Sequence, residues 1–146
     1  MAKAILADCE SKKRTITEIE VLAVLRAWVF RKNYNRKNVM KTNVEWVHSD
    51  TLGLIRFQSG GFIVADATQE HPQVTQVMTK WLHDQCPTEI GTDFQCTSIS
   101  VNKNYGGRLH RDAGNEGPSI LMSLGDFTGG ELNYWPLDTG NNNSTN

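Results

Sequence analysis

The chain has 146 residues, of which 38% are hydrophobic and 21% charged, and these values exclude a disordered or low-complexity protein. No apolar run approaches the roughly 20 residues of a membrane-spanning helix, and residues 4–7 are too short for the apolar part of a signal peptide. The three cysteines, an odd and sparse set, are not a disulfide framework. We therefore expect one intracellular domain, cytoplasmic or nuclear, with no membrane association.

Positive charge is concentrated in the first part of the chain. Residues 1–56 contain 11 Lys and Arg against 6 Asp and Glu, whereas residues 57–146 contain 4 against 10. Residues 31–41 form a basic segment, with the cations Arg31, Lys32, Arg36, Lys37 and Lys41. Such a segment is typical either of a solvated loop after a helix or of a contact with an acidic partner such as nucleic acid, and both remain open.

The first predicted elements are helical. Residues 1–14 are polar and are predicted to be a flexible N-terminus. Thr15 followed by Glu18 fits a capping box and predicts a helix over residues 15–32, apolar on most faces and therefore buried. A basic, Asn-rich loop over residues 33–43 is expected to follow.

Short strands are predicted next, over residues 44–48, 52–57 and 62–65. The last two are separated by Ser59, Gly60 and Gly61, which favour a hairpin turn.

A second helix is predicted over residues 72–85, before Pro87. Its apolar side chains recur at helical spacing and are expected to face the core: Val74, Val77, Met78, Trp81 and Leu82.

From residue 94 onward the pattern is typical of an all-β meander. Strands are predicted over residues 94–102, 119–124 and 131–135, with glycine-rich turns between them. Helices followed by short strands predict an α+β fold in which the N-terminal helices pack on a sheet.

Two His-x-Asp triplets are the candidate metal-binding motifs, His48-Ser49-Asp50 and His110-Arg111-Asp112. In a strand, side chains two residues apart share a face, so each triplet can offer an imidazole and a carboxylate together. A third ligand would complete the 2-His-1-carboxylate triad of non-haem Fe(II) oxygenases. The first triplet is interpreted as a surface His and a turn Asp before a strand. The second, between predicted strands, is the favoured iron site.

The region around the second triplet resembles the Fe(II)/2-oxoglutarate-dependent dioxygenase domain of protist and algal proteins. It is similar in a looser way to the TET/JBP nucleobase oxygenases. The stretches that carry the resemblance are Thr97–Tyr105, His110–Asp112, Asn115–Ser119 and Gly125–Leu132.

This resemblance implies a double-stranded β-helix, a distorted jelly roll, with Fe(II) as cofactor and 2-oxoglutarate as cosubstrate. It implies that His110 and Asp112 are iron ligands. Asn102, Asn104 and Tyr105 are candidates for lining the cosubstrate pocket. No residue is assigned as a general acid or base, and the oxidised substrate is open.

The family pattern also needs a second His and a cation that pairs with the cosubstrate carboxylate. No His follows His110 and no Lys or Arg follows Arg111. We therefore expect residues 15–93 to be a support region, residues 94–139 the N-terminal half of the oxygenase core, and residues 140–146 an Asn-rich tail. The expected protein is a truncated oxidoreductase domain that is inactive by itself. The alternative is a non-catalytic remnant or binding module that contacts nucleic acid through residues 31–41.

Overall fold

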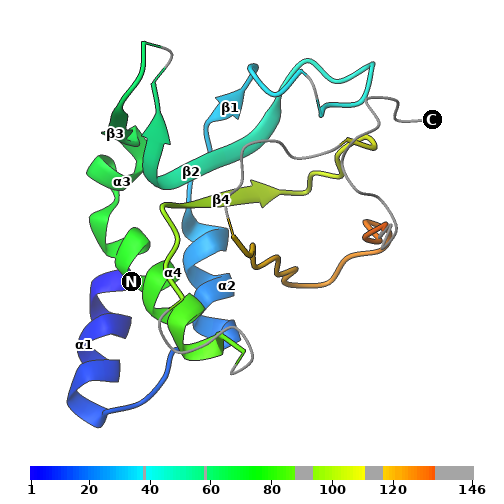
Figure 1. The fold of residues 1–146 in the computed structure, drawn as a ribbon. Coiled ribbons are helices and arrows are strands. Elements are labelled where there is room, and N and C mark those ends of the chain that lie inside the picture. The colour runs from blue at the N-terminus through cyan, green and yellow to red at the C-terminus, as the bar shows by residue number, and fades with distance from the viewer. Residues whose placement is uncertain (38, 58, 88–93, 111–116, 134–146) are drawn as a thin grey trace.

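Strand β2 (Val47–Arg56) is the centre of the fold in the computed structural model, which describes residues 1–37, 39–57, 59–87, 94–110 and 117–133 (Figure 1). Three strands pair with it in antiparallel fashion: β1 (Lys32–Asn33), β3 (Phe62–Val64) and β4 (Ser98–Lys103). β4 lies along the first half of β2, whereas β3 pairs with its second half. The four described strands form an open antiparallel sheet within an α+β fold.

Gly53 lies where β2 passes from one partner to the next. Its φ is +94°, which L side chains rarely adopt, and its N–H donates to the Thr68 hydroxyl at 2.7 Å. A Cβ at this position would lie 2.3 Å from the Thr97 carbonyl oxygen. Only glycine therefore permits β2 to approach the chain just before β4 this closely.

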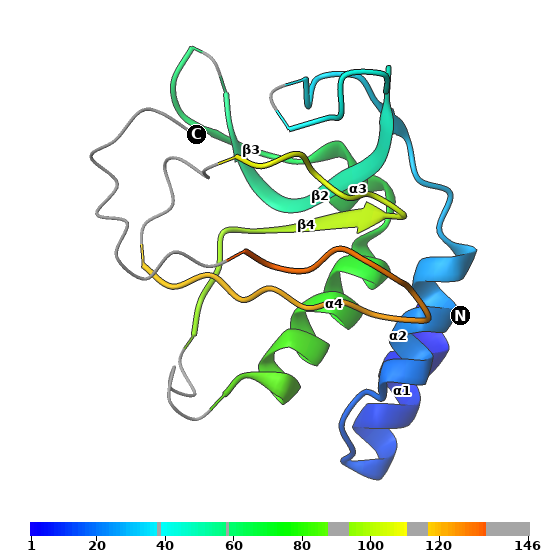
Figure 2. The same cartoon turned by 90° about the vertical axis from the view of Figure 1, so that its right-hand side faces the viewer.

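Helices α1 (Ala2–Lys12), α2 (Glu18–Ala27) and α4 (Pro72–Gln85) lie together on one side of the sheet (Figures 1 and 2). The short helix α3 (Asp66–Glu70) links β3 to α4. No helix in the described ranges is both long and apolar enough to cross a bilayer.

The core lies between these helices and the sheet. The helix predicted over residues 72–85 is confirmed as α4, and its stripe is buried through Val77, Met78 and Trp81. Leu52 of β2 is fully buried in the same cluster. Burying one such side chain contributes roughly 1.5–3 kcal/mol, so these contacts, more than helix propensity, hold α4 against β2.

The prediction of a flexible N-terminus over residues 1–14 is wrong, because residues 2–12 form α1. Ala2, Ile5, Leu6 and Cys9 recur at helical spacing and pack against the core, with Cys9 fully buried. This narrow stripe is interrupted by charged residues, which made the segment look uniformly polar.

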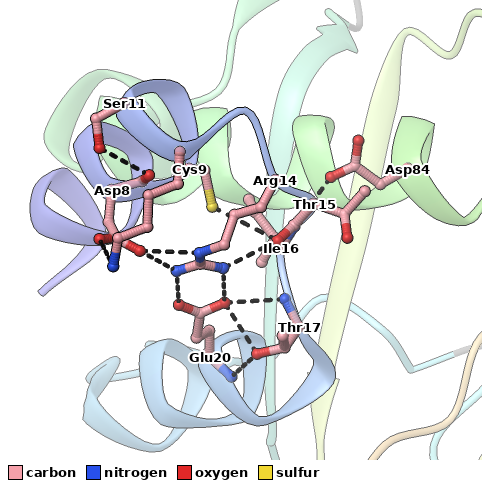
Figure 3. Close-up of polar contacts among 10 residues, drawn as sticks. Asp8, Cys9, Ser11, Arg14, Thr15, Ile16, Thr17, Glu20 and Asp84 are labelled. Carbon is pink, nitrogen blue, oxygen red and sulfur yellow. Dashed lines mark hydrogen bonds and ion pairs between the residues drawn. The ribbon is translucent and has the colours of Figure 1, made fainter.

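The capping box is two residues later than predicted. Thr17, not Thr15, is the N-cap of α2: its hydroxyl accepts from the Glu20 N–H at 3.3 Å, and Glu20 Oε2 accepts from the Thr17 N–H at 2.9 Å (Figure 3). Thr15 and Ile16 instead connect α1 to the core, since the Ile16 N–H donates to Asp84 of α4 at 3.1 Å. Both Thr17 and Glu20 satisfy N–H groups that a helix start leaves unpaired.

An ion-pair network fixes this cap. The Arg14 guanidinium donates to Asp8 Oδ2 and to Glu20 Oε1, each at 2.6 Å (Figure 3). The hydrogen bond from Arg14 lowers the pKa of Glu20 to about 2. Hydrogen bonds from Lys12 and then Arg14 lower the pKa of Asp8. The network thus joins α1 to the start of α2.

Helix α2 ends at Ala27, short of the predicted end at residue 32. Trp28 and Phe30 are buried while Val29 between them is 86% exposed. This alternation is that of extended chain, whose successive side chains point to opposite faces. Tertiary burial of two aromatic rings therefore overrides the helical pattern.

The strands before α4 agree in part with the prediction. Residues 44–48 and 52–57 were expected to be separate strands, but residues 47–56 form the single strand β2, because its partners continue the ladder through both. The hairpin is confirmed: β2 and β3 are antiparallel, and the Phe57 N–H donates to the Gly61 carbonyl at 3.0 Å.

The all-β meander expected after residue 94 is wrong for the described residues. β4 overlaps the predicted 94–102 strand but begins at Ser98 and ends at Lys103, and residues 119–124 and 131–133 adopt no strand. Residues 134–135, the rest of the last predicted strand, lie outside the described residues. An apolar run alone does not specify a strand, and in residues 119–124 only Leu124 is packed against the core cluster while Leu121 is 75% exposed.

Candidate functional site

The candidate site begins where β4 ends. Asn104 turns the chain with a positive φ of 50°, a conformation that Asn tolerates better than most residues. Beyond it, the Arg108 N–H donates to the Val39 carbonyl at 2.9 Å. This bond ties the loop that carries His110 to the basic segment, so two parts of the chain distant in sequence lie together.

The imidazole of His110 is oriented by its own loop. Its Nδ1 lies 2.7 Å from the Arg108 carbonyl oxygen. A carbonyl can only accept, so Nδ1 is the donor of this hydrogen bond. The ring also lies over Gly107, where a Cβ would come within 3.2 Å of its Cε1. A backbone carbonyl on the second nitrogen is typical of histidines that ligate metals.

The other predicted iron ligand, Asp112, lies outside the described residues. Within the described part of the chain, no group of three or more His, Cys, Asp and Glu side chains could hold a metal ion. A ligand set that includes Asp112 is not tested by that finding.

The three predicted cosubstrate residues are not all on one surface. Asn102 pairs with Ser49 across β2 and β4, on the sheet face opposite to His48. Asn104 and Tyr105 line a common hollow beside β2. Asn102 is not among its lining residues, so the structure brings together two of the three.

Tyr105 has a buried hydroxyl that makes no hydrogen bond with any described residue. Burial raises the pKa of Tyr105, and the nearby positive charges of Arg36 and Arg108 oppose that rise. An unsatisfied buried hydroxyl is costly, because it loses its hydrogen bonds with water. It is therefore a position at which a polar ligand atom would be favourable.

The first triplet is placed differently from the prediction. His48 and Asp50 lie on the central strand β2, not at a surface and a turn. Asp50 is buried and accepts from the Arg31 N–H at 3.2 Å, which fixes the chain between α2 and β1. His48 is half-buried between Phe30 and Trp46, with ring centroids 6.4 and 4.9 Å away. The long-range pairing of β2 with β4 explains this burial.

The hollow beside β2 has a volume of about 360 Å³. Six of its lining side chains are polar or aromatic: Lys41, Trp46, His48, Lys103, Asn104 and Tyr105. Sequence reasoning missed Lys41, Trp46, His48 and Lys103 as members of one site. The spacing of Trp46 and His48, two residues apart on a strand, was the available signal, but the strand register that adds Lys103 is not visible in the sequence.

The cations of the basic segment have unequal surroundings. Arg31 is paired with both Asp66 and Glu70 of α3. Arg36 donates to the Ser49 hydroxyl at 3.2 Å. Lys32 places its ammonium 4.4 Å from the centroid of the Trp46 ring. Arg31 therefore has a structural role, whereas Lys32 places a positive charge beside the Trp46 ring.

Comparisons with protein-family models, with curated proteins and with solved structures gave no match for this chain. The dioxygenase resemblance of residues 94–135 therefore stays a prediction from the sequence.

Proposed function

We propose that this chain carries part of an Fe(II)- and 2-oxoglutarate-dependent dioxygenase domain whose core is a double-stranded β-helix. The His-x-Asp triplet and its flanking motifs in the sequence support this proposal. The observation that carries it is the hydrogen bond from His110 Nδ1 to the Arg108 carbonyl, the contact that metal-ligating histidines commonly make with their second nitrogen.

In this proposal His110 and Asp112 hold the metal. Fe(II), when bound, supplies oxygen activation in enzymes of this class. The chain's own contribution is to orient one imidazole, since the hydrogen bond to the Arg108 carbonyl engages Nδ1.

The cosubstrate is assigned to the hollow lined by Asn104 and Tyr105. The buried Tyr105 hydroxyl, which is without a partner among described residues, fits a carboxylate of 2-oxoglutarate as a hydrogen-bond acceptor. Arg36 and Arg108 lie close enough to affect the pKa of Tyr105 and supply positive charge for the same anion. Asn102 faces away from this hollow and is the weakest of the three candidates.

A metal titration tests the proposal. The wild-type chain and the variants His110→Ala, Asp112→Ala and His48→Ala are titrated with Mn(II), a surrogate for Fe(II). We expect weak binding that is lost in the first two variants and kept in the third, because His48 is occupied by packing against Phe30 and Trp46. Equal loss of Mn(II) binding in His48→Ala would contradict the assignment of the metal to the triplet that contains His110.

An assay for succinate in the presence of Fe(II) and 2-oxoglutarate complements the titration. These 146 residues offer one imidazole and one carboxylate in the motif, whereas the triad needs three ligands, so we expect no turnover. Succinate formation abolished by His110→Ala would mean that a third ligand comes from an upstream His or from a second chain.

A further inference from the structure

β1, the start of β2 and the end of β4 come together at one end of the sheet (Figure 1). Three cations and two aromatic rings lie at this end. We call this the aromatic–basic surface, and it consists of Lys32, Lys41, Trp46, His48 and Lys103. The strand register explains its arrangement. Lys32 of β1 and Lys103 of β4 both lie directly opposite His48 of β2. Residues opposite each other in a ladder share a face, so two ammonium groups flank one imidazole.

The aromatic rings of this surface are in contact. Trp46 and His48 have centroids 4.9 Å apart with an interplanar angle of 50°. The ammonium of Lys32 lies 4.4 Å from the Trp46 centroid, and that of Lys103 lies 6.0 Å from the Phe30 centroid. Cation–π contacts at such distances contribute modestly and are readily exchanged for a stronger anionic partner.

The positive charge of this surface is not neutralised by the protein. Among the described residues, no ion pair involves Lys32, Lys41 or Lys103, in contrast to Arg31 and its two carboxylates. Residues 31–44 and 95–110 contain no Asp or Glu, and the exposed Glu45 beside Trp46 forms no ion pair with these lysines among the described residues. Cations held close together without counter-charges repel one another, and an anion bound between them would relieve that repulsion.

The hollow identifies the chemistry of the ligand. Its volume of about 360 Å³ is within the range of small-molecule sites, and its wall combines the Trp46 indole with the Asn104 side chain and two ammonium groups. Aromatic rings beside Lys side chains are the combination that binds unstacked bases and their phosphates. A duplex keeps its bases stacked inside, so a single strand is the form that can present one.

Positive charge also extends beyond the hollow. Arg36 and Lys37 continue along the same loop, which is joined to the His110 loop by the bond from Arg108 to Val39. This stretch exceeds what one nucleotide would contact and favours a strand of several nucleotides over a free nucleotide.

We propose that the aromatic–basic surface binds single-stranded nucleic acid, with one base in the hollow against Trp46 and the adjoining phosphates at Lys32, Lys41 and Lys103. The site does not depend on the proposed iron ligands, but its hollow is the one assigned above to 2-oxoglutarate, so the two ligands are expected to compete for it. It gives a defined location to nucleic-acid contact through the basic segment.

Fluorescence anisotropy with a labelled 12-mer oligothymidylate tests this proposal on the whole chain. We expect Trp46→Ala to weaken binding roughly 10-fold, as loss of one base stack does, and Trp46→Phe to retain most of the affinity. Lys103→Gln should weaken binding and reduce the slope of log K against log salt by about 0.7, the contribution of one phosphate contact in a single strand. Lys3→Gln, which removes an exposed charge from α1, is the matched control and should change neither.

Three competitors and one variant complete the experiment. An unlabelled 12-mer should displace the probe, whereas thymidine monophosphate at equal nucleotide concentration and polyglutamate should not. Displacement by either of those two would overturn the strand assignment, as would equal affinities of Trp46→Ala, Lys103→Gln and Lys3→Gln. His110→Ala should bind the oligonucleotide normally while losing Mn(II). The nucleic-acid site and the iron site can therefore fail separately.

Discussion

The chain before residue 88 and the chain after residue 93 differ in how they use their apolar side chains. Of the eight helices and strands that the described residues form, seven lie before residue 88 and one, β4, lies after residue 93. In the earlier part, Val21, Leu52 and Val77 are fully buried. In residues 117–133, by contrast, Leu121 and Leu132 are each 75% exposed.

The buried core and the proposed metal-binding motif therefore lie largely in different parts of the chain. The earlier part holds the core between its helices and β2, whereas the later part carries the His110 motif on a loop beyond β4. Reactive side chains are commonly placed on loops that a rigid scaffold positions. Changes to the buried core of the first part should therefore affect the free energy of unfolding, and changes around His110 should affect metal binding.

The largest expected effect is on the core. Leu52→Ala should lower the free energy of unfolding by about 2–5 kcal/mol, because it leaves a cavity in a fully buried cluster. Leu121→Ala makes the same chemical change at an exposed position and should stay within about 0.5 kcal/mol of the wild type. Urea denaturation followed by circular dichroism measures both. Similar decreases in the free energy of unfolding of the two variants would contradict the proposed difference between the buried core and residues 117–133.

The contact between the two parts is tested at Gly53. Ala at this position would place a methyl group 2.3 Å from the Thr97 carbonyl oxygen, in addition to the strain of a positive φ. Gly60 has a comparable φ of 90° and open space around it. Gly53→Ala should therefore destabilise the fold by at least about 1 kcal/mol more than Gly60→Ala, the scale of overpacking. Equal thermal melting temperatures of the two variants would contradict the close approach.

A smaller effect is expected at the cap of α2. Thr17→Ala should cost about 1 kcal/mol, since the Glu20 N–H loses its acceptor. Thr15→Ala is the matched control, because only the carbonyl of Thr15 is used in the described hydrogen bonds. Urea denaturation measures the free energy of unfolding of both variants. A larger decrease in Thr15→Ala than in Thr17→Ala would indicate that Thr15 is the N-cap, as predicted from the sequence.

The smallest effect concerns pH. The pKa of Glu20 is lowered from 4.5 to about 2 in the folded state, chiefly by the hydrogen bond from Arg14. Its stabilising contribution is therefore present above pH 4.5 and is lost as the pH falls toward 2. Glu20→Gln keeps a capping side chain but should flatten the acid limb of the stability curve in this window. An unchanged acid limb in the variant would show that the Arg14 network does not act on folding.

The sequence predicted the elements whose signals are local. The apolar stripe of α4 repeats over three turns, and Gly60 and Gly61 mark the β2–β3 turn, so both were found. α1 was missed because its stripe is narrow and Asp8 and Lys12 interrupt it. The cap was displaced because the choice between Thr15 and Thr17 depends on Arg14, which reaches across from the end of α1.

The site was predictable only in part for a related reason. The His110 motif and the pair Asn104 and Tyr105 were visible as local patterns, and the structure places that pair in one hollow. Trp46, His48 and Lys103 meet only through the pairing of β2 with β4, which joins residues more than 50 positions apart in the sequence. A sequence contains the residues of such a site but not the register that assembles them.

The assignment of the metal site to His110 and Asp112 is tested most directly by nuclear magnetic resonance. The signals of the four histidine rings are recorded through long-range couplings to the ring nitrogens during a titration with Mn(II). The resonances of a ligating ring broaden first, because paramagnetic relaxation falls steeply with distance. We expect the His110 signals to disappear at the lowest Mn(II) concentrations while those of His48, His71 and His83 persist. Asp112→Ala should abolish this selectivity. Earlier broadening of His48, or equal broadening of all four rings, would contradict the assignment of the metal site to His110 and Asp112.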